Sequence, residues 1–453
     1  MSSSVIVRFA PSPTGLLHIG NIRAALYNFL FATRHGGEFF LRLEDTDQKR
    51  SREEFAEAIE RDLTWLGLTW THKARQSDRL DVYATALERL KATGRVYPCF
   101  ETQAELDLRR KAQLAQGRPP VYDRAARRLS PEERAKLEAE GRTPHWRFRL
   151  EETDVSWNDL IQGPKHFAPG TLSDPVIVRE DGLPLFTFSS VLDDVDYRTT
   201  HVIRGEDHVT NTVIQLQIWR TLTDAPPPQF AHFPLLVDAE GGGLSKRLGA
   251  LSIASLRDDE GLEPMAINAL LARLGTSDPI EPLATLAALA ERFDLAHVTR
   301  STPRFAMKDL VALNAHLVRL MPFEVAGPRL QALGLADVTE DLWKAVAPNL
   351  ERLRDVAPWQ HVVRGPLVPP PPAAEDVAFL AEALRVLPPE PWDSTTWGTW
   401  IDVLKQTSGR KGKALFAPLR LALTGDPTGP EMRALLPLIG RARAEKRLNG
   451  ETA

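Results

Sequence analysis

Residues 8–20 read RFAPSPTGLLHIG, a loop of small residues between an apolar strand over residues 5–9 and a helix that begins at about Gly20. Gly15 and Gly20 carry no Cβ, so a ring or a phosphate can approach the main chain closely at both positions. Residues 22–33 repeat apolar side chains at helical spacing, which predicts a helix. The N-terminal, positive end of its dipole would point back at the loop. The stretch therefore predicts a nucleotide-binding loop, with an arginine and a histidine at its rim.

The composition is that of a globular protein, because 43% of the 453 residues are hydrophobic. That length has room for about two to four domains. Lysine and arginine number 56 against 60 aspartate and glutamate residues, which gives a formal charge of −4. Any RNA binding must therefore come from local basic surface, since the overall charge neither supports nor excludes it.

The single cysteine, Cys99, excludes an intramolecular disulfide and a cysteine-rich zinc site. The N-terminal residues lack the charged-then-apolar pattern of a signal peptide. No stretch approaches the roughly 20 consecutive apolar residues that a membrane span needs. We therefore expect a cytoplasmic protein that makes no membrane contact.

Strands over residues 5–9 and 37–43 enclose the first helix, in the order typical of a doubly wound parallel sheet. Ser51 and Glu54 have the spacing of a capping box, which predicts a helix that opens there and continues to about Leu66. These elements indicate an α/β domain at the start of the chain.

From about Tyr83 to Arg179 the composition shifts to long charged helices, one of which is predicted to begin at residues 130–133, SPEE. The alternating pattern resumes with an apolar strand at residues 174–178, so strands of the first domain are expected to flank an inserted domain. Beyond Ile253 the pattern is almost entirely helical. A proline-rich break at residues 366–372 cannot be helix and is expected to be an exposed loop or turn.

The order of residues in 8–20 resembles the first signature of class I aminoacyl-tRNA synthetases, and that of glutamyl-tRNA synthetases in particular. The second signature of that class is similar to residues 243–247, GLSKR, a glycine-rich loop that delivers one ammonium group. Residues 411–425, KGKALFAPLRLALTG, are similar to a characteristic segment of bacterial glutamyl-tRNA synthetases. The resemblance therefore extends over essentially the whole chain.

The resemblance implies an α/β fold in which a Rossmann-like parallel-sheet catalytic domain carries an inserted α+β domain for the tRNA acceptor stem. An all-α C-terminal region that binds the anticodon is expected to follow. We divide the chain into the first half of the catalytic domain (1–82), the inserted acceptor-binding domain (83–180), the second half with the Ser-Lys-Arg loop (181–255), a helical stem-contact domain (256–320) and the all-helical anticodon-binding domain (321–453).

Activation of an amino acid requires its carboxylate to attack the α-phosphorus of ATP, so the enzyme mainly aligns two anions and neutralises phosphate charge. His18, as a hydrogen-bond donor, and Lys246, as a mobile cation, suit that work and are the predicted catalytic residues. A lone histidine is more often a cap and a lone lysine a solvated residue, but the neighbouring glycines favour function for both. The predicted ATP-binding residues are His18, Gly20, Asp207, Leu236, Leu244, Ser245 and Lys246, with Asp207 and Leu236 implied by the resemblance alone.

Glutamate carries two carboxylates and one ammonium group, so its pocket should contain about two cations and one anion. Two cations and one anion are available in Arg8, Arg204 and Glu44. Each ends or follows a predicted strand, and open α/β sheets bind ligands at the carboxyl ends of their strands. A structural ion pair is the alternative for each, and for Glu44 alone the two interpretations are evenly balanced. With the positions that the resemblance adds, the predicted glutamate-binding residues are Arg8, Ala10, Ser12, Glu44, Phe186, Ser190 and Arg204.

Three positions depart from the family pattern. Many relatives have a tyrosine hydroxyl at Phe186, a larger amide at Ser190 and a lysine at Gly243. The pocket is therefore expected to lose hydrogen bonds to its substrate, so that either water replaces them or selectivity differs. Lys246 then supplies the main charge of its loop unless Arg247 assists.

The inserted domain often carries a zinc knuckle in this family, but here Cys99 stands alone beside Tyr97 and Tyr122. We therefore predict no structural zinc and no metal ligands. The basic stretch 118–128 has two interpretations of equal weight, an RNA-backbone contact and a solvated helix end. For the basic residues within 441–447, a charge cluster at a helix end is favoured over phosphate contacts.

The resemblance implies ATP-dependent ligation of L-glutamate to the 3′ end of tRNA-Glu through a glutamyl-adenylate, with Mg²⁺ accompanying the ATP. It also implies that tRNA is needed for efficient activation. We expect a monomer whose partners are tRNA, L-glutamate and ATP. The sequence leaves open whether tRNA-Gln is charged as well.

Three alternatives predict different features. Glutaminyl-tRNA synthetases have a similar catalytic part but a β-barrel anticodon part, which the helical C-terminal pattern argues against. A truncated relative that modifies a queuosine base lacks the C-terminal half that this chain has. A catalytically silent RNA-binding paralogue would bind tRNA without exchanging ATP and pyrophosphate, so that assay separates it from an active enzyme.

Overall fold

The computed structural model describes residues 4–244 and 251–453, which fold into two compact units. The first unit consists of residues 1–259 with 267–306, and the second consists of residues 260–266 with 307–453. None of the described helices is long and apolar enough to cross a membrane.

Parallel strands form the centre of the first unit, as the alternation of strands and helices predicts. One sheet consists of β1 (Ile6–Phe9), β2 (Glu38–Leu43) and β3 (His72–Arg75), paired in this order, and a second consists of β9 (His201–Gly205), paired with β10 (Gln229–Phe233). The backbone nitrogen of Thr200 donates to the carbonyl of Ile6 over 2.9 Å, so β9 starts beside the start of β1. The parallel strands β1 and β9 therefore end on the same side.

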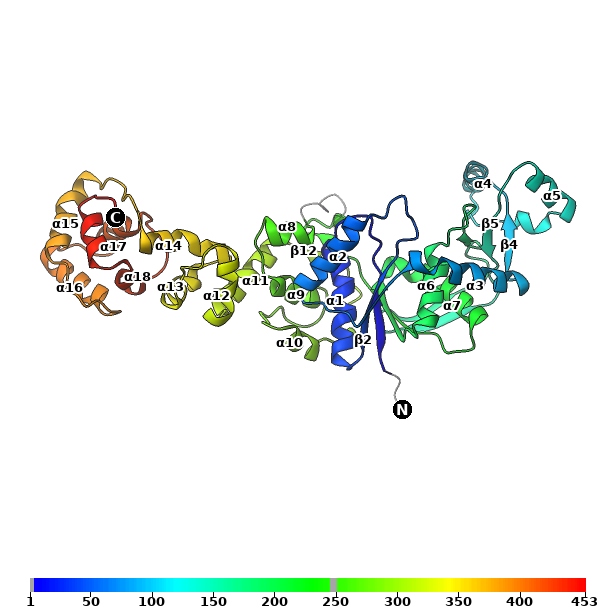
Figure 1. The fold of residues 1–453 in the computed structure, drawn as a ribbon, viewed down its shortest axis with the longest axis horizontal. Coiled ribbons are helices and arrows are strands. Elements are labelled where there is room, and N and C mark those ends of the chain that lie inside the picture. The colour runs from blue at the N-terminus through cyan, green and yellow to red at the C-terminus, as the bar shows by residue number, and fades with distance from the viewer. Residues whose placement is uncertain (1–3, 245–250) are drawn as a thin grey trace. The chain divides into compact units, whose positions relative to one another are not determined.

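Four helices accompany these strands: α1 (Ile19–Arg34), α2 (Glu53–Trp65), α6 (Phe186–Asp196) and α7 (Val209–Leu222). Ile22, Leu26 and Leu30 recur every four residues on α1 and are fully buried, so this face packs as an amphipathic helix does. Figure 1 shows α1 beside β2, against which it packs.

The start of α2 differs from the prediction, because Ser51 does not cap the helix. The helix begins at Glu53 after Arg52, whose side chain makes no capping hydrogen bond, and Glu54 pairs with the Arg52 guanidinium over 3.2 Å. The backbone nitrogen of Ser51 donates to the carbonyl of Asp47, which keeps Ser51 in the preceding turn. The spacing of a capping box is present here without its geometry.

The predicted insertion has antiparallel sheets of its own, as expected for an α+β domain. Strands β4 (Val96–Cys99), β5 (His145–Phe148) and β8 (Val176–Val178) pair in this order, and β6 (Val155–Asp159) forms a hairpin with β7 (Gly163–Phe167). The helices are α3 (Leu80–Ala92), α4 (Gln103–Ala115) and α5 (Pro131–Ala139). Ser130 caps α5 with a complete capping box, which confirms that prediction.

The prediction that residues 174–178 return to the first sheet is wrong. β8 pairs antiparallel with β5, with Trp146 opposite Val178, and therefore belongs to a sheet of the insertion. A short apolar run carries no signal of its pairing partner, so the pattern alone could not assign the sheet.

The rest of the first unit adds short elements. They are β11 (Val237–Asp238), β12 (Arg304–Phe305), α8 (Ile253–Asp258), α10 (Leu286–Glu291) and α9 (Pro264–Arg273), whose residues are divided between the two units.

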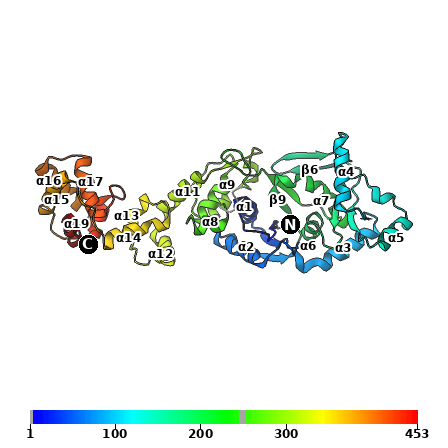
Figure 2. The same cartoon turned by 90° about the horizontal axis from the view of Figure 1, so that it is seen from above.

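The second unit is helical, as predicted for the C-terminal half. Figures 1 and 2 show its helices α11 (Met307–Leu320), α12 (Phe323–Ala332), α13 (Glu340–Val346), α14 (Ala357–Arg364), α15 (Ala374–Arg385), α16 (Thr396–Ser408), α17 (Lys413–Thr424), α18 (Met432–Ile439) and α19 (Arg441–Leu448). They enclose an apolar core that includes the fully buried Trp400. Residues 366–372 connect α14 to α15 without helix, as predicted. Residues 256–320 are divided between the two units, and the five-segment division of the chain stays a prediction.

Candidate active site

A cavity of about 630 Å³ opens where β1 and β9 end. Ten of the predicted site residues line it: Arg8, Ala10, Ser12, His18, Gly20, Phe186, Arg204, Asp207, Leu236 and Leu244. The structure therefore brings the loop 8–20 and the start of the glycine-rich loop to one cavity. Glu44 and Ser190 are outside its lining, and the predicted residues Ser245 and Lys246 lie outside the described residues.

His18 forms the N-terminal cap of α1. Its Nδ1 accepts a hydrogen bond from the backbone nitrogen of Gly20 over 3.1 Å, and the Asn21 side chain accepts one from the His18 backbone. Because Nδ1 accepts, the proton of the neutral ring is on Nε2, and burial lowers the pKa of the ring and so favours the neutral form. The two interpretations of His18, a cap and a donor to phosphate, are compatible because they use different nitrogens.

The glycines around the cavity differ in what they make room for. A Cβ on Gly20 would lie 3.0 Å from Cε1 of His18, so the missing side chain accommodates the histidine ring. A Cβ on Gly15 would meet no described atom within 4 Å. At the end of β9, a Cβ on Gly205 would lie 2.5 Å from Oδ1 of Asp207, so glycine allows Asp207 to fold back over the strand end.

Arg204, at the end of β9, is a buried cation whose described partners are all neutral. Its guanidinium donates to Nε2 of His232 over 3.2 Å, and to Oγ1 of Thr212 and Oε1 of Gln215, both over 2.7 Å. Within residues 4–244 and 251–453, its buried Nη1 has no hydrogen-bond partner. Burial and the nearby charge of Arg8 lower the pKa of Arg204 to about 9. A carboxylate bound here would supply the missing counter-charge.

Arg8 belongs to a buried ion cluster beside the cavity. The Asp194 carboxylate accepts from Nε and Nη2 of Arg8 over 3.1 and 3.4 Å, and from Nη1 of Arg42 over 2.8 Å. Arg42 also pairs with Glu44 over 3.1 Å and with Asp193 over 3.5 Å. Burial alone would lower the pKa of Arg42, but these three carboxylates raise it, so the guanidinium stays charged.

Glu44 follows β2 as predicted, and its carboxylate faces Arg42 inside this cluster. Burial raises the pKa of Glu44 to about 7, because the charge of Arg42 offsets only part of the desolvation. The sequence interpretation missed Arg42, although a signal was present. An arginine inside the apolar strand 38–43 shares one face with Glu44 two residues on, and a buried charge requires an opposite charge.

The hydroxyl of Ser190 accepts a hydrogen bond from the side-chain amide of a residue on another helix. Gln215, on α7, donates through Nε2 to Oγ of Ser190 over 2.8 Å and accepts from Arg204 through Oε1. Ser190 therefore helps to hold this amide against Arg204. Sequence spacing could not indicate this contact, because the two residues are on different helices. The expected replacement by water or change in selectivity stays a prediction.

Phe186 begins α6, and its ring centre lies 5.3 Å from that of His208. His208 lines the cavity but was missed in the sequence interpretation, although it closely follows the strand-end residue Arg204. Burial and the charge of Arg204 lower the pKa of His208 to about 4, so its imidazole is neutral at physiological pH.

In the insertion, Cys99 is less isolated than the sequence suggests. Its sulfur and one ligand atom each from Glu101 and His145 lie within 4.8 Å of one another. The neighbours favour a hydrogen-bonded network, because the Tyr122 hydroxyl donates to Glu101 over 2.7 Å and the Arg147 guanidinium stacks 4.1 Å from the Tyr122 ring centre. Burial raises the pKa of the Cys99 thiol to about 12, so the protonated thiol is the form that belongs to this network. The absence of structural zinc stays a prediction.

Three basic residues of the proposed RNA-binding stretches have structural partners. Arg124 and Arg128, in the stretch 118–128, pair with aspartates, both over 3.0 Å. Arg447 is 1% exposed and donates to two backbone carbonyls. These pairings favour the structural interpretation for the three residues.

Comparison with known proteins agrees with this architecture. The model for the catalytic domain of class I tRNA synthetases (E and Q) matches residues 4–312, and that for an anticodon binding domain matches residues 330–450. Glutamate–tRNA ligase of Azospirillum brasilense is 56% identical over 450 residues, covering 99% of this chain and 100% of that protein. Glutamate–tRNA ligase 1 of Parvibaculum lavamentivorans is 56% identical over 454 residues, covering 100% of both.

The fold is also similar to solved structures. A crystal structure of a glutamate tRNA ligase from Elizabethkingia meningosepticum in complex with its amino acid matches with a TM-score of 0.87 and 28% identity, covering 99% of both chains. Glutamate-tRNA synthetase from Elizabethkingia anophelis matches with a TM-score of 0.85 and the same identity and coverage. From its parallel-sheet catalytic part to its helical C-terminal unit, this chain belongs to the glutamate–tRNA ligase family of the class I tRNA synthetases.

Proposed function

We propose that this protein catalyses the ATP-dependent ligation of L-glutamate to the 3′ end of tRNA-Glu, for use in protein synthesis. Family membership supports the proposal, and so does one observation in the chain itself. The buried guanidinium of Arg204 has no hydrogen-bond partner at Nη1 within the described ranges and lines the cavity beside Arg8. Arg8 is already paired with Asp194, whereas the described hydrogen bonds of Arg204 go to neutral groups, so a glutamate carboxylate bound in the cavity would stabilise the charge of Arg204.

The reaction proceeds in two steps. In the first, an α-carboxylate oxygen of glutamate attacks the α-phosphorus of ATP, the bond to the bridging β-phosphate oxygen breaks, and pyrophosphate leaves. In the second, a terminal ribose hydroxyl of the tRNA attacks the activated carbonyl, AMP leaves, and the hydroxyl proton is released. No protein nucleophile takes part, so the chain contributes alignment and charge.

For ATP, we propose that the Nε2–H of His18 donates to a phosphate oxygen and that Lys246 supplies the second positive charge. Gly20, Asp207, Leu236 and Leu244 line the same cavity, and Ser245 is included from the resemblance. Mg²⁺ would accompany the ATP and neutralise part of the phosphate charge.

For glutamate, we propose that Arg8 and Arg204 face its carboxylates and that Glu44, which pairs with Arg42 beside the cavity, supplies the negative charge for its ammonium group. Ala10, Ser12 and Phe186 line the cavity, whereas Ser190 would act on the substrate only through Gln215 and Arg204.

For tRNA, we propose that residues 83–180 contact the acceptor end and that residues 321–453 contact the anticodon. The match of an anticodon binding domain to residues 330–450 supports the second assignment. We further propose a monomer that acts in the cytoplasm and holds no structural zinc. The ability of tRNA-Gln to serve as a second acceptor is decided by charging assays with the two purified tRNAs.

ATP–pyrophosphate exchange tests the proposed activity. With glutamate and tRNA-Glu both present, labelled pyrophosphate should enter ATP, and glutamine or aspartate in place of glutamate should give no exchange. A chain that binds tRNA-Glu but exchanges nothing with glutamate would be a silent RNA-binding paralogue, and the proposal would be wrong.

A further inference from the structure

His232, on β10, lies between Arg204 and an aspartate of the insertion. Its Nε2 is 3.2 Å from Nε of Arg204, and its Nδ1 contacts Oδ2 of Asp159. The side chains of His232 and Asp159 are both fully buried. A guanidinium Nε can only donate, so Nε2 of the imidazole must accept, and the ring proton must be on Nδ1, where it is donated to Asp159.

Both carboxylate oxygens of Asp159 accept hydrogen bonds, which fix the side chain in place. Its Oδ1 accepts from the backbone nitrogens of Ile161 over 3.1 Å, Gln162 over 2.9 Å and His232 over 3.1 Å. Burial would raise the pKa of Asp159, but the hydrogen bonds from His232 and from the backbone lower it to about 2, so it remains an acceptor. An ionised acceptor opposite Nδ1 determines which nitrogen of His232 carries the proton.

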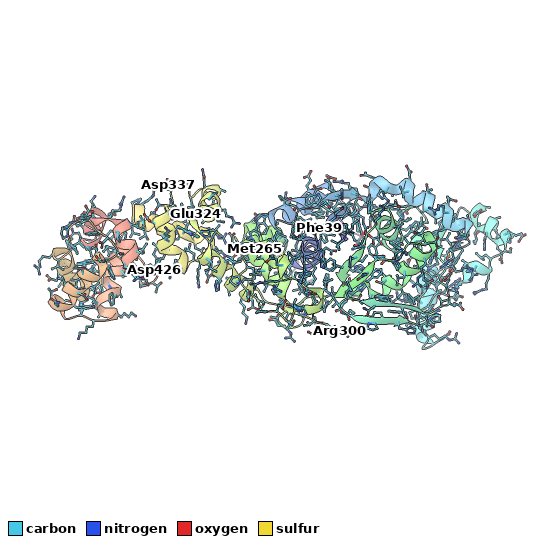
Figure 3. The ribbon with its side chains drawn as sticks, turned by 90° about the horizontal axis from the view of Figure 1, so that it is seen from below. Phe39, Met265, Arg300, Glu324, Asp337 and Asp426 are labelled. Carbon is cyan, nitrogen blue, oxygen red and sulfur yellow. The ribbon has the colours of Figure 1, made fainter. Side chains whose placement is uncertain are left out.

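The turn that follows Asp159 is held against other parts of the first unit by several hydrogen bonds. The backbone nitrogen of Leu160 donates to the carbonyl of Phe230 over 2.8 Å. Nε of Arg300, labelled in Figure 3, donates to the carbonyl of Ile161 over 3.1 Å. Nε2 of Gln162 donates to the carbonyl of His232 over 3.3 Å. The position of the carboxylate is therefore set by the tertiary structure and not by one flexible side chain.

These contacts account for every nitrogen of the Arg204 guanidinium but one. Nε is held by His232, and Nη2 is held by Thr212 and Gln215. Nη1 is left buried, with no partner in the described part of the chain, in a residue that lines the cavity. We propose that Asp159 and His232 are positioning residues of the glutamate site: through a fixed imidazole tautomer they hold Arg204 so that Nη1 is free for a substrate carboxylate.

This inference rests on the proposed function, and a pair of variants tests it. The amide nitrogen of asparagine can replace Nδ1 of histidine, whereas the amide group of glutamine reaches the position of Nε2. His232→Asn should therefore keep the bond to Asp159 and lose the acceptor for Arg204. His232→Gln should lose the hydrogen bond to Asp159 but can still present an oxygen to Arg204. If the buried contact with Asp159 served only to stabilise the fold, His232→Gln would be the more damaging of the two variants.

In charging assays with saturating tRNA-Glu, we expect His232→Asn to raise the KM for glutamate about 10-fold to 100-fold, the usual effect of losing a hydrogen bond to a charged group. The KM for ATP should stay within about twofold, and His232→Gln should retain most of the glutamate affinity. Asp159→Asn presents an NH₂ group to Nδ1, reverses the tautomer, and should resemble His232→Asn. Equal effects of His232→Asn and His232→Gln, or equal rises in both KM values, would overturn the proposal.

A direct measurement covers the case in which a variant does not fold. The wild-type protein can be labelled with nitrogen-15 in its histidines and the His232 signals assigned by NMR. These signals should show the ring proton on Nδ1 over the whole pH range in which the protein is folded. A proton on Nε2 would overturn the proposal whatever the variants do. If wild-type protein fails to exchange pyrophosphate with glutamate, the proposed function fails, and the tautomer measurement still reports separately on the Asp159–His232–Arg204 arrangement.

Discussion

Removal of the Arg204 guanidinium should weaken glutamate binding selectively. In Arg204→Ala, the substrate loses one charge-assisted hydrogen bond to Nη1, worth about 1.5–3 kcal/mol, so the KM for glutamate should rise about 10-fold to 100-fold. The described hydrogen bonds of Arg204 go to His232, Thr212, Gln215 and the His208 carbonyl, and none goes to the loop 8–20. The KM for ATP should therefore change little.

Arg204→Lys is the matched control for this experiment. It keeps a positive charge but loses the planar fork that bonds to four neighbours at once, so its glutamate KM should lie between those of wild type and Arg204→Ala. The assay is tRNA charging at saturating ATP and tRNA with glutamate varied, supported by the shift in thermal unfolding that glutamate produces. A glutamate KM that is unaltered in Arg204→Ala would refute the assignment of Arg204, and parallel rises in both KM values would show that the substitution disturbs the whole cavity.

Three further predictions concern other parts of the chain. Lys246→Ala should lower adenylate formation strongly and leave tRNA affinity nearly intact in filter binding, and unchanged activation kinetics would contradict the role assigned to the lysine. Glu44 has a folded pKa of about 7 against an ordinary value of 4.5, so its protonated form stabilises the fold at low pH and this contribution is lost as pH rises through that interval. Relative to wild type, Glu44→Gln should therefore gain stability between pH 5 and pH 8, by at most about 2.5 kcal/mol, in chemical denaturation; a constant difference would exclude the raised pKa. Purified protein should contain no stoichiometric zinc by elemental analysis, and EDTA should leave its thermal unfolding unchanged, whereas a chelator-induced loss of the insertion's structure would show that Cys99, Glu101 and His145 hold a metal.

The sequence was sufficient for the parts of the fold that depend on local pattern. Strand–helix alternation located β1, α1 and β2 because apolar periodicity and small loop residues act within one element. It failed at β8, whose partner strand is distant in sequence, and at Ser51, where spacing was correct but the backbone turned differently. Both failures concern geometry that neighbouring residues alone do not determine.

Some residues of the candidate site could be predicted from local sequence pattern and others could not. Arg8 and Arg204 were predicted because they end strands, and the edge where parallel strands end collects ligand-binding residues. The residues that hold Arg204 in place, Gln215, His232 and Asp159, come from a helix, another strand and the insertion. Nothing in their spacing relates them, since only tertiary packing brings them to one guanidinium.

Through His232, the carboxylate of Asp159 at the end of β6 connects the insertion to a cavity residue, Arg204. A chimera that exchanges residues 83–180 as a cassette would also exchange the carboxylate on which the His232 proton depends. An imported segment without an acid at that position would disturb a pocket whose other residues are native. Successful grafts should therefore carry Asp159 and His232 together, and related sequences should show the two positions changing in concert.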